Sequence, residues 1–147
     1  MLDHPPLVLV VDDDEDSRYV YSRLLTHRGY AVAEAASGVE GLRLAVDTAP
    51  ALIIMDYLLP GMTGWEATRL LKASPTTARI PVINVTAYTY DGIADDARAA
   101  GCDDFIAKPC DPFDVVSAVV RQIGMASSRV PTPRRIAAIA EDESAVA

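Results

Sequence analysis

Five short apolar runs, each followed by a longer segment of helical pattern, restrict the possible folds of this chain more than any other feature. The runs at 7–11, 51–55 and 81–85 are almost continuously apolar and rich in β-branched residues, as is typical of strands covered on both faces in a parallel sheet. Strict alternation of strand and helix predicts right-handed crossovers and a doubly wound α/β fold. The expected strands are 7–11, 31–35, 51–55, 81–85 and 104–108; the expected helices cover about 15–27, 64–73, 91–100 and 111–124, with one more opening at Ser37.

Signals at the helix ends support this division of the chain. Gly29 and Gly101 follow the first and fourth helical segments, where glycine commonly ends a helix. Ser37 and Glu40 have the spacing of a capping box, in which each side chain accepts a hydrogen bond from the other residue's backbone N–H. Asp111, followed by proline, predicts the start of the fifth helix.

The length and the C-terminal composition predict a single domain. A chain of 147 residues suffices for one domain with an additional segment. We assign the domain to residues 5–124 and expect 125–147 to be a flexible tail, because Pro131 and Pro133 interrupt any helix that continues there. We expect no output domain after residue 124.

Charge and composition argue against several classes of function. The formal net charge of −8 disfavours a general nucleic-acid-binding surface. Cys102 and Cys110 lie outside any zinc-binding or thioredoxin-like motif. No apolar stretch approaches the ~20 residues needed to span a bilayer, and no basic segment typical of a secretion signal precedes the first apolar run. We therefore expect a cytoplasmic protein that binds neither membranes nor, directly, nucleic acid.

Reactive side chains follow the expected strands at the point where each strand ends. Asp12 and Asp13 come directly after the first strand, and Asp56 comes after the third. Thr86 and Lys108 stand at the ends of the fourth and fifth. In a doubly wound sheet, ligands bind at the carboxyl ends of the strands. The alternation therefore predicts that these five residues meet at one edge of the sheet.

Their chemistry suits phosphoryl transfer. A run of acids is often only a solvated turn, but carboxylates brought together in a cleft repel one another unless a cation lies between them. Oxygen ligands of this kind favour Mg²⁺. Lys108 is one of only two lysines and offers a compact charge, while Thr86 offers a hydroxyl. A carboxylate nucleophile with these neighbours can receive and neutralise a phosphoryl group.

Three other kinds of site fit the same residues less well. A haloacid-dehalogenase-type phosphatase uses a DxD motif and Mg²⁺, but the Gly-Thr expected after that motif is replaced by Glu15-Asp16. A calcium loop starting at Asp12 would place Ser17 where glycine is needed and Arg23 where glutamate is needed. The phosphate loop of a flavodoxin-like cofactor protein would not tolerate the run of acids after the first strand.

The motifs VVDDDED, IIMDYLLPGMTGWE, PVINVTAY and FIAKP occur in this order. In sequence and spacing they resemble the receiver domain of two-component response regulators, the CheY-like family, over roughly residues 5–124. The resemblance implies a five-stranded parallel sheet in the order 2-1-3-4-5 with five flanking helices. It also implies a phosphorelay switch rather than a conventional enzyme, one that catalyses only its own phosphotransfer and autodephosphorylation.

The resemblance also implies a role for each site residue. Asp56 would accept a phosphoryl group from a phosphohistidine, and Asp12 and Asp13 would form the acidic pair, with Asp13 nearer the metal. Asp56 and the backbone carbonyl of Leu58 would complete the protein ligands of Mg²⁺, and Mn²⁺ would be an alternative ion. Thr86 and Lys108 would bind the phosphoryl oxygens, and Lys108–Pro109 would be a cis peptide bond.

The resemblance implies that four residues act in switching and in the lifetime of the phosphorylated state. Thr86 and Phe105 would change position on phosphorylation; many family members have tyrosine in place of Phe105, so here no ring hydroxyl takes part. Leu58 and Tyr88 would flank the path of the hydrolytic water. Because Leu58 is apolar and Tyr88 is a bulky aromatic, both should hinder that water, and we expect a relatively long-lived phosphoaspartate.

The implied partners are a histidine kinase or a histidine phosphotransfer protein upstream and a protein target downstream. The target would bind the face formed by the helix at 91–100, the strand at 104–108 and the helix at 111–124. A homodimer is also compatible with the family. We expect a stand-alone receiver; the alternative is a fragment of a larger regulator or hybrid kinase.

Overall fold

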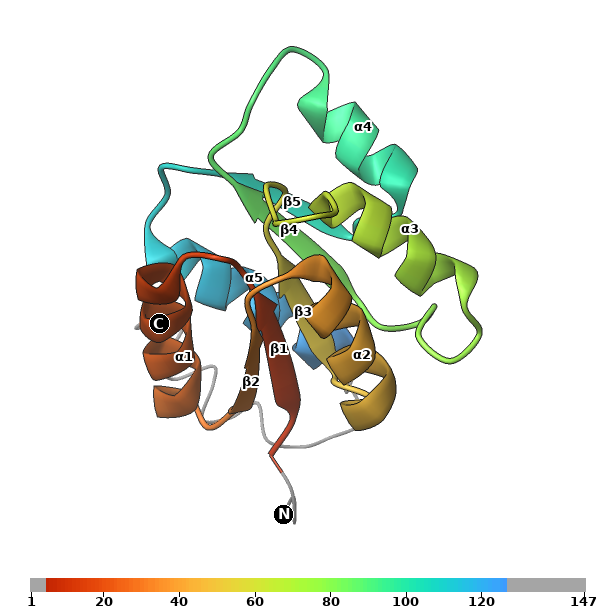
Figure 1. The fold of residues 1–147 in the computed structure, drawn as a ribbon. Coiled ribbons are helices and arrows are strands. Elements are labelled where there is room, and N and C mark those ends of the chain that lie inside the picture. Colours follow the sequence, from red (N-terminus) through yellow and green to blue (C-terminus); the bar gives the residue numbers. More distant parts are fainter. Residues whose placement is uncertain (1–4, 127–147) are drawn as a thin grey trace.

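The structure is a computed structural model that describes residues 5–126. Five parallel strands form one sheet in the order β2-β1-β3-β4-β5 (Figure 1). The strands are β1 (Leu7–Val11), β2 (Ala31–Ala35), β3 (Leu52–Met55), β4 (Val82–Thr86) and β5 (Asp104–Ala107). The helices are α1 (Glu15–His27), α2 (Gly38–Thr48), α3 (Gly64–Ala73), α4 (Ile93–Ala100) and α5 (Pro112–Ala126). The expected fold class and strand order are confirmed.

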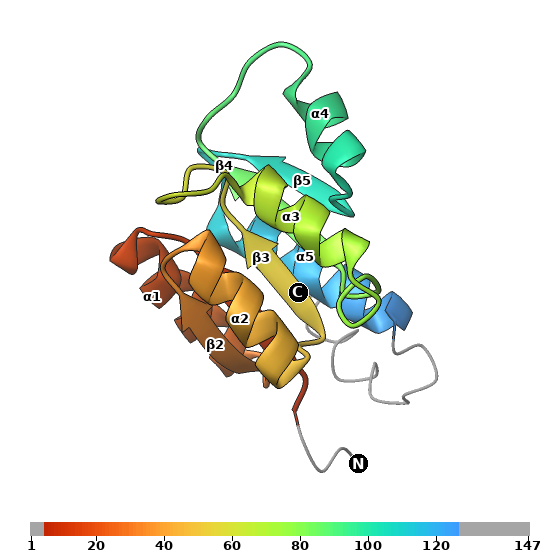
Figure 2. The same cartoon turned by 45° about the vertical axis from the view of Figure 1, so that its right-hand side comes forward.

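Helices cover the sheet on both faces, with α2, α3 and α4 on one face and α1 and α5 on the other (Figures 1 and 2). Side chains alternate between these two layers along each strand. On β1, Leu9 and Val11 pack under α2, while Val8 and Val10 pack under α1 and α5. The inner strands β1, β3 and β4 are therefore almost wholly buried, whereas the edge strands are only half-buried.

Most helix and strand bounds agree with the sequence predictions to within a residue or two. Helix α4 begins at Ile93 rather than Asp91, after Gly92 in a left-handed conformation. Helix α5 extends to Ala126, two residues beyond its expected end, and Asp111 accepts from the Phe113 N–H as predicted for its cap. The expected tail from 127 onward lies outside the described residues.

The predicted capping box at the start of α2 is wrong in one of its two bonds. Ser37 Oγ accepts from the Glu40 N–H at 3.2 Å, but the Glu40 carboxylate accepts from Ala36 N–H instead of Ser37 N–H. A complete capping box forms at α3, where Thr63 Oγ1 and the Glu66 carboxylate each accept the other residue's backbone N–H.

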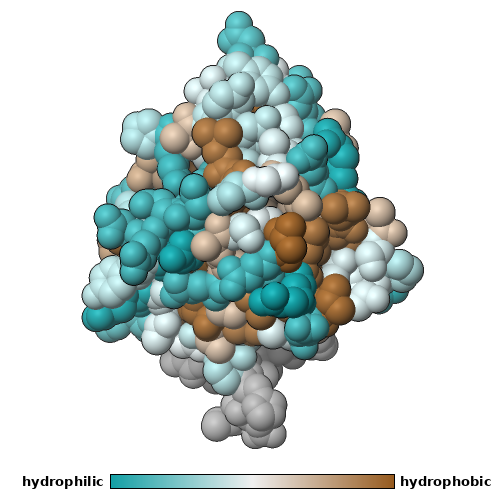
Figure 3. Space-filling model, viewed as in Figure 1, coloured by the Kyte–Doolittle hydropathy of each residue, from teal (hydrophilic) through white to brown (hydrophobic). Residues whose placement is uncertain are grey.

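The surface is mainly hydrophilic, with scattered hydrophobic patches on the face seen in Figure 3. Exposed large apolar side chains include Val39 and Val46 of α2 and Leu70 of α3. Among the described residues, no helix has both the length and the apolar character required to cross a membrane.

Candidate functional site: an acidic cluster at the carboxyl ends of β1 and β3

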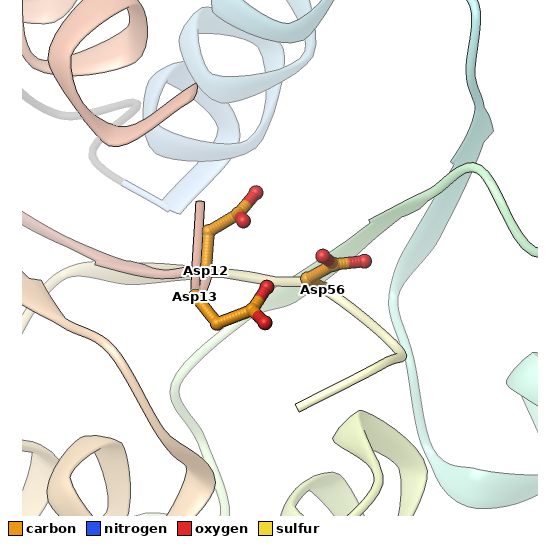
Figure 4. Close-up of side chains that lie close together, drawn as sticks. All are labelled: Asp12, Asp13 and Asp56. Atoms are coloured by element: carbon orange, nitrogen blue, oxygen red, sulfur yellow. The ribbon is translucent and has the colours of Figure 1, made fainter. Parts of the chain in front are cut away.

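Three carboxylates meet where β1 and β3 end (Figure 4). Each of Asp12, Asp13 and Asp56 places an oxygen within 4.8 Å of oxygens from the other two. The strand register explains this arrangement, because Val11 lies opposite Met55 and the next residues on both strands are the acids. The Asp56 N–H also donates to the Val11 carbonyl at 3.0 Å. The predicted convergence of these three residues is confirmed.

Asp12 is buried and held by several neighbours. Its side chain is almost fully covered, and its Oδ1 accepts from the Asp14 N–H at 2.9 Å. Arg18 Nη1 donates to the Asp12 backbone carbonyl at 2.7 Å. Lys108 Nζ lies 3.5 Å from Asp12 Oδ2, a long ion pair. These contacts fix the position of Asp12.

Asp14 is not part of the cluster. Its carboxylate accepts from the Ser17 backbone N–H and hydroxyl at the start of α1, and the same hydrogen bonds lower the pKa of Asp14. Asp14 follows the same strand as Asp12 and Asp13, but its side chain serves as the N-cap of α1.

The surroundings of Asp56 disfavour its charged form. Burial, followed by the nearby charge of Asp12, raises the pKa of Asp56 to about 6, while Lys108 and the hydrogen bond from Tyr57 N–H act in the opposite direction. A cation at this point would relieve the repulsion among the carboxylates. Three converging carboxylates with a raised pKa in one of them fit a hard divalent ion.

Thr86 and Lys108 lie at the ends of the neighbouring strands β4 and β5. Thr86 is fully buried, and its hydroxyl oxygen accepts from the Tyr88 N–H at 3.0 Å. The Lys108 N–H donates to the Thr86 carbonyl at 2.8 Å, and the Lys108–Pro109 peptide bond is cis, as expected. Both side chains therefore belong to the same edge of the sheet as the acidic cluster.

The remaining predicted residues surround this edge. Phe105 of β5 is half-buried and packs against the core layer under α3 and α4. Leu58 and Tyr88 are 54% and 45% exposed, so both side chains reach the surface beside the cluster. The Tyr88 ring stacks on that of Tyr57, with centroids 5.0 Å apart and an interplanar angle of 9°.

An aromatic cluster next to the site was not predicted from the sequence. The rings of Tyr57, Trp65, Tyr88 and Tyr90 contact one another in a closed cycle, which joins the loop after Asp56 to the loop after Thr86. The residues come from these two loops and from the start of α3, so no periodic pattern indicates their contact.

Gly64 is a second residue that sequence reasoning missed. A Cβ on Gly64 would overlap the backbone carbonyl oxygen of Asp56, so only glycine fits here. The Gly64 N–H donates to the Tyr57 carbonyl at 2.7 Å. Gly64 thereby sets the path of the chain from Asp56 into α3, and the isolated glycine in MTGWE was the only signal of it.

Comparison with known proteins agrees with this geometry. The family model of the response regulator receiver domain matches residues 8–120. The polar-differentiation response regulator DivK of Brucella anthropi is 37% identical over 105 residues, which cover 71% of this chain and 85% of DivK. The phosphate regulon transcriptional regulatory protein PhoB of Pseudomonas aeruginosa is 35% identical over 127 residues; these are 84% of this chain but only 56% of PhoB.

Solved structures show the same fold. The receiver domain of the sensor histidine kinase PA1611 from Pseudomonas aeruginosa, determined with a magnesium ion coordinated in its active site cleft, is 31% identical with a TM-score of 0.74. The match covers 82% of this chain and 98% of that one. With the strand order, the acidic edge and the family match in agreement, the chain belongs to the response regulator receiver domain family of two-component signalling proteins.

Proposed function

We propose that Asp56 accepts a phosphoryl group from the phosphohistidine of a histidine kinase or histidine phosphotransfer protein. The observation that supports this most strongly is the convergence of Asp12, Asp13 and Asp56 oxygens within 4.8 Å at the strand ends. An oxygen of the Asp56 carboxylate forms the new P–O bond while the P–N bond to the donor imidazole breaks, and the imidazole leaves with its electron pair.

The neighbouring residues supply binding and charge. Asp12, Asp13, Asp56 and the backbone carbonyl of Leu58 are the proposed protein ligands of Mg²⁺; Mn²⁺ has the same preference for oxygen ligands. The bound ion would neutralise charge on the transferring phosphoryl group. Lys108 stands beside Asp12 and supplies an ammonium to a phosphoryl oxygen. The Thr86 hydroxyl, whose oxygen already accepts a hydrogen bond, retains its proton for donation to another.

The lifetime of the phosphoaspartate depends on access of water. Leu58 and Tyr88 both reach the surface beside the cluster, and the stack of Tyr88 on Tyr57 limits its motion. We propose that these side chains shield the acyl phosphate and make it long-lived. The chain would then catalyse only its own phosphotransfer and slow autodephosphorylation.

Replacement of Leu58 or Tyr88 by asparagine tests this shielding. Each variant should lose the phosphoryl group faster than wild type, by about three- to tenfold, because an amide can orient the attacking water. The lifetime is followed by intact-mass spectrometry after removal of the phosphodonor. Leu70→Asn, at an equally exposed leucine on α3, is the control and should leave the lifetime unchanged. Equal lifetimes in all three variants would contradict the proposed role.

Output is proposed to occur by protein contact at the face formed by α4, β5 and α5. Thr86 and Phe105, on the paired strands β4 and β5, would transmit the change to that face. The chain spans most of DivK but only about half of PhoB. We propose a stand-alone receiver, and the alternative is a receiver within a larger regulator or hybrid kinase. We also propose that the protein is cytoplasmic and that it can form a homodimer.

The direct test of the transfer uses phosphoramidate, a small donor with the P–N bond of phosphohistidine. In the presence of Mg²⁺, the protein should become phosphorylated, and excess chelator should abolish the reaction. Lys108→Ala should slow phosphorylation at least tenfold while the protein stays folded by circular dichroism. Phosphorylation at an unchanged rate in chelator or in Lys108→Ala would overturn the proposed mechanism.

A further inference from the structure

Two buried polar atoms in residues 5–126 have no hydrogen-bond partner: the indole Nε1 of Trp65 and the carboxamide Oδ1 of Asn84. One is a donor and the other an acceptor. A buried polar group left unpaired costs about 1–3 kcal/mol, and such groups are few in native proteins. Their retention beside a functional site suggests a state of the protein in which they are paired.

Asn84 lies within the sheet, directly beneath the site. It is fully buried on β4, two residues before Thr86. The strand register places it between Met55 and Phe105, so its side chain shares the sheet face covered by α3. Its Nδ2 donates to the Met55 carbonyl at 3.0 Å, which ties β4 to the residue just before Asp56.

Trp65 covers the same face from the first turn of α3. Its ring is nearly fully buried and belongs to the core layer that contains Met55 and Val82. The Trp65 ring meets the Tyr57 ring edge-on, with centroids 4.6 Å apart. Trp65 is thus linked to the residue after Asp56, just as Asn84 is linked to the residue before it.

We propose that Asn84 and Trp65 form a conformational switch beneath Asp56, in which Trp65 Nε1–H donates to Asn84 Oδ1 only when Asp56 is phosphorylated. This inference rests on the proposed function. The two side chains are coupled to the backbone on either side of Asp56 and to the strand that ends in Thr86. A shift of Thr86 toward a new negative charge moves the end of β4 and alters the distance between donor and acceptor.

The unpaired oxygen of Asn84 carries an energetic cost in this layer. Leucine at position 84 would fill a similar volume without that oxygen, but it would also remove the hydrogen bond from Asn84 Nδ2 to the Met55 carbonyl. A hydrogen bond between the two atoms in the phosphorylated state makes that state more favourable. A bond near the upper end of the usual net range changes the equilibrium constant by about tenfold.

The single tryptophan makes the pairing directly observable. The chain contains one Trp, so its ¹⁵N–¹H spectrum holds one indole N–H signal. Beryllium fluoride with Mg²⁺ serves as the phosphoryl analogue. We expect the indole proton to shift downfield on its addition to wild type, as for a newly made hydrogen bond, and to stay in place in Asn84→Leu while the Tyr57 amide still shifts.

A double-mutant cycle measures the same bond by affinity. Asn84→Leu and Trp65→Phe should each weaken beryllium fluoride binding by about five- to tenfold, and the double variant should be no weaker than either one, because a single bond is lost. Thr68→Val is the control. Thr68 is also a fully buried residue of α3, but its hydroxyl already donates to the Gly64 carbonyl, so its replacement should preserve the indole shift.

The outcomes separate the switch from the proposed function. An indole signal that stays in place in wild type while the Tyr57 amide shifts overturns the switch alone, as does a double variant whose loss equals the product of the single losses. Acetyl phosphate supplies the independent check. If it leaves no phosphoryl adduct on the wild-type protein by mass spectrometry, the proposed function fails and the switch fails with it.

Discussion

At the scale of single residues, the surroundings of Asp56 destabilise its charged form. Its carboxylate is partly buried beside the charge of Asp12, and both effects raise its pKa. The sequence was sufficient to predict this meeting of Asp12, Asp13 and Asp56, since all three follow strands expected to end at one edge of a parallel sheet, and the family resemblance implied that the first and third strands are neighbours. It did not reveal that Asp14 turns away to cap α1, because the choice between cap and ligand depends on side-chain orientation.

Asp56→Asn should stabilise the metal-free protein in a pH-dependent way. The pKa of Asp56 is about 6 in the folded protein and 3.8 in the unfolded chain, so the stability that protonated Asp56 contributes is fully present below pH 3.8 and is lost as the pH rises through 6. After allowance for screening, the variant should gain about 1–2 kcal/mol at pH 7. Urea unfolding in chelator measures this gain.

The pH profile supplies the control for that prediction. Asparagine remains neutral throughout, so the gain should shrink between pH 6 and pH 4 and be absent below pH 4. A gain of the same size at pH 4 and pH 7 would show that Asp56 is not destabilised by its charge.

At the scale of elements, the connection from β3 to α3 determines how Asp56 is presented. The Thr63–Glu66 capping box fixes the start of α3, and Gly64 contacts the Asp56 carbonyl. Helix α3 itself was predicted at about 64–73, and the structure has it at Gly64–Ala73. The close approach of Gly64 to β3 was not predicted, because it depends on where the helix lies on the sheet.

Gly64→Ala should disturb both the fold and the site. The added methyl group would meet the Asp56 carbonyl oxygen, so the connection must move, at a cost of about 1–3 kcal/mol. Phosphorylation by acetyl phosphate should slow at least tenfold because the Asp56 backbone is displaced. Chemical unfolding and phosphorylation rate are the two measurements.

Gly61→Ala is the matched control in the same connection. Gly61 has a positive φ of 77° but open space around a Cβ, so alanine there costs about 1 kcal/mol through backbone strain alone. Its phosphorylation rate should stay near wild type. A Gly64→Ala variant that behaves like Gly61→Ala would contradict the packing argument.

At the scale of the whole molecule, alternation of strands and helices was enough to predict the layered fold and the edge that holds the site. The contacts that the sequence did not reveal are those among loops and across layers. The Tyr57–Tyr88 stack joins two loops that are separate in sequence, and the unpaired groups of Asn84 and Trp65 belong to different elements, β4 and α3. No periodicity relates such residues, so only the assembled sheet and helices bring them together.

Binding of Mg²⁺ should stabilise the entire domain, because only the folded chain holds the three carboxylates together. At ten times the dissociation constant, the gain is about 1.4 kcal/mol. Thermal unfolding with increasing Mg²⁺ measures it, and chelator should reverse it. Asp13→Asn should abolish most of the gain, whereas Asp16→Asn, at an exposed acid outside the cluster, should retain it. An equal gain in both variants would place the ion elsewhere.

The most direct test of the account is to locate the phosphoryl group itself. The protein is incubated with acetyl phosphate and Mg²⁺, and the intact mass and peptide fragments are measured. The account predicts a mass increase of one phosphoryl group per chain, located on Asp56 and absent from Asp56→Asn. An adduct on another residue, or one that persists undiminished in Asp56→Asn, would contradict the central claim.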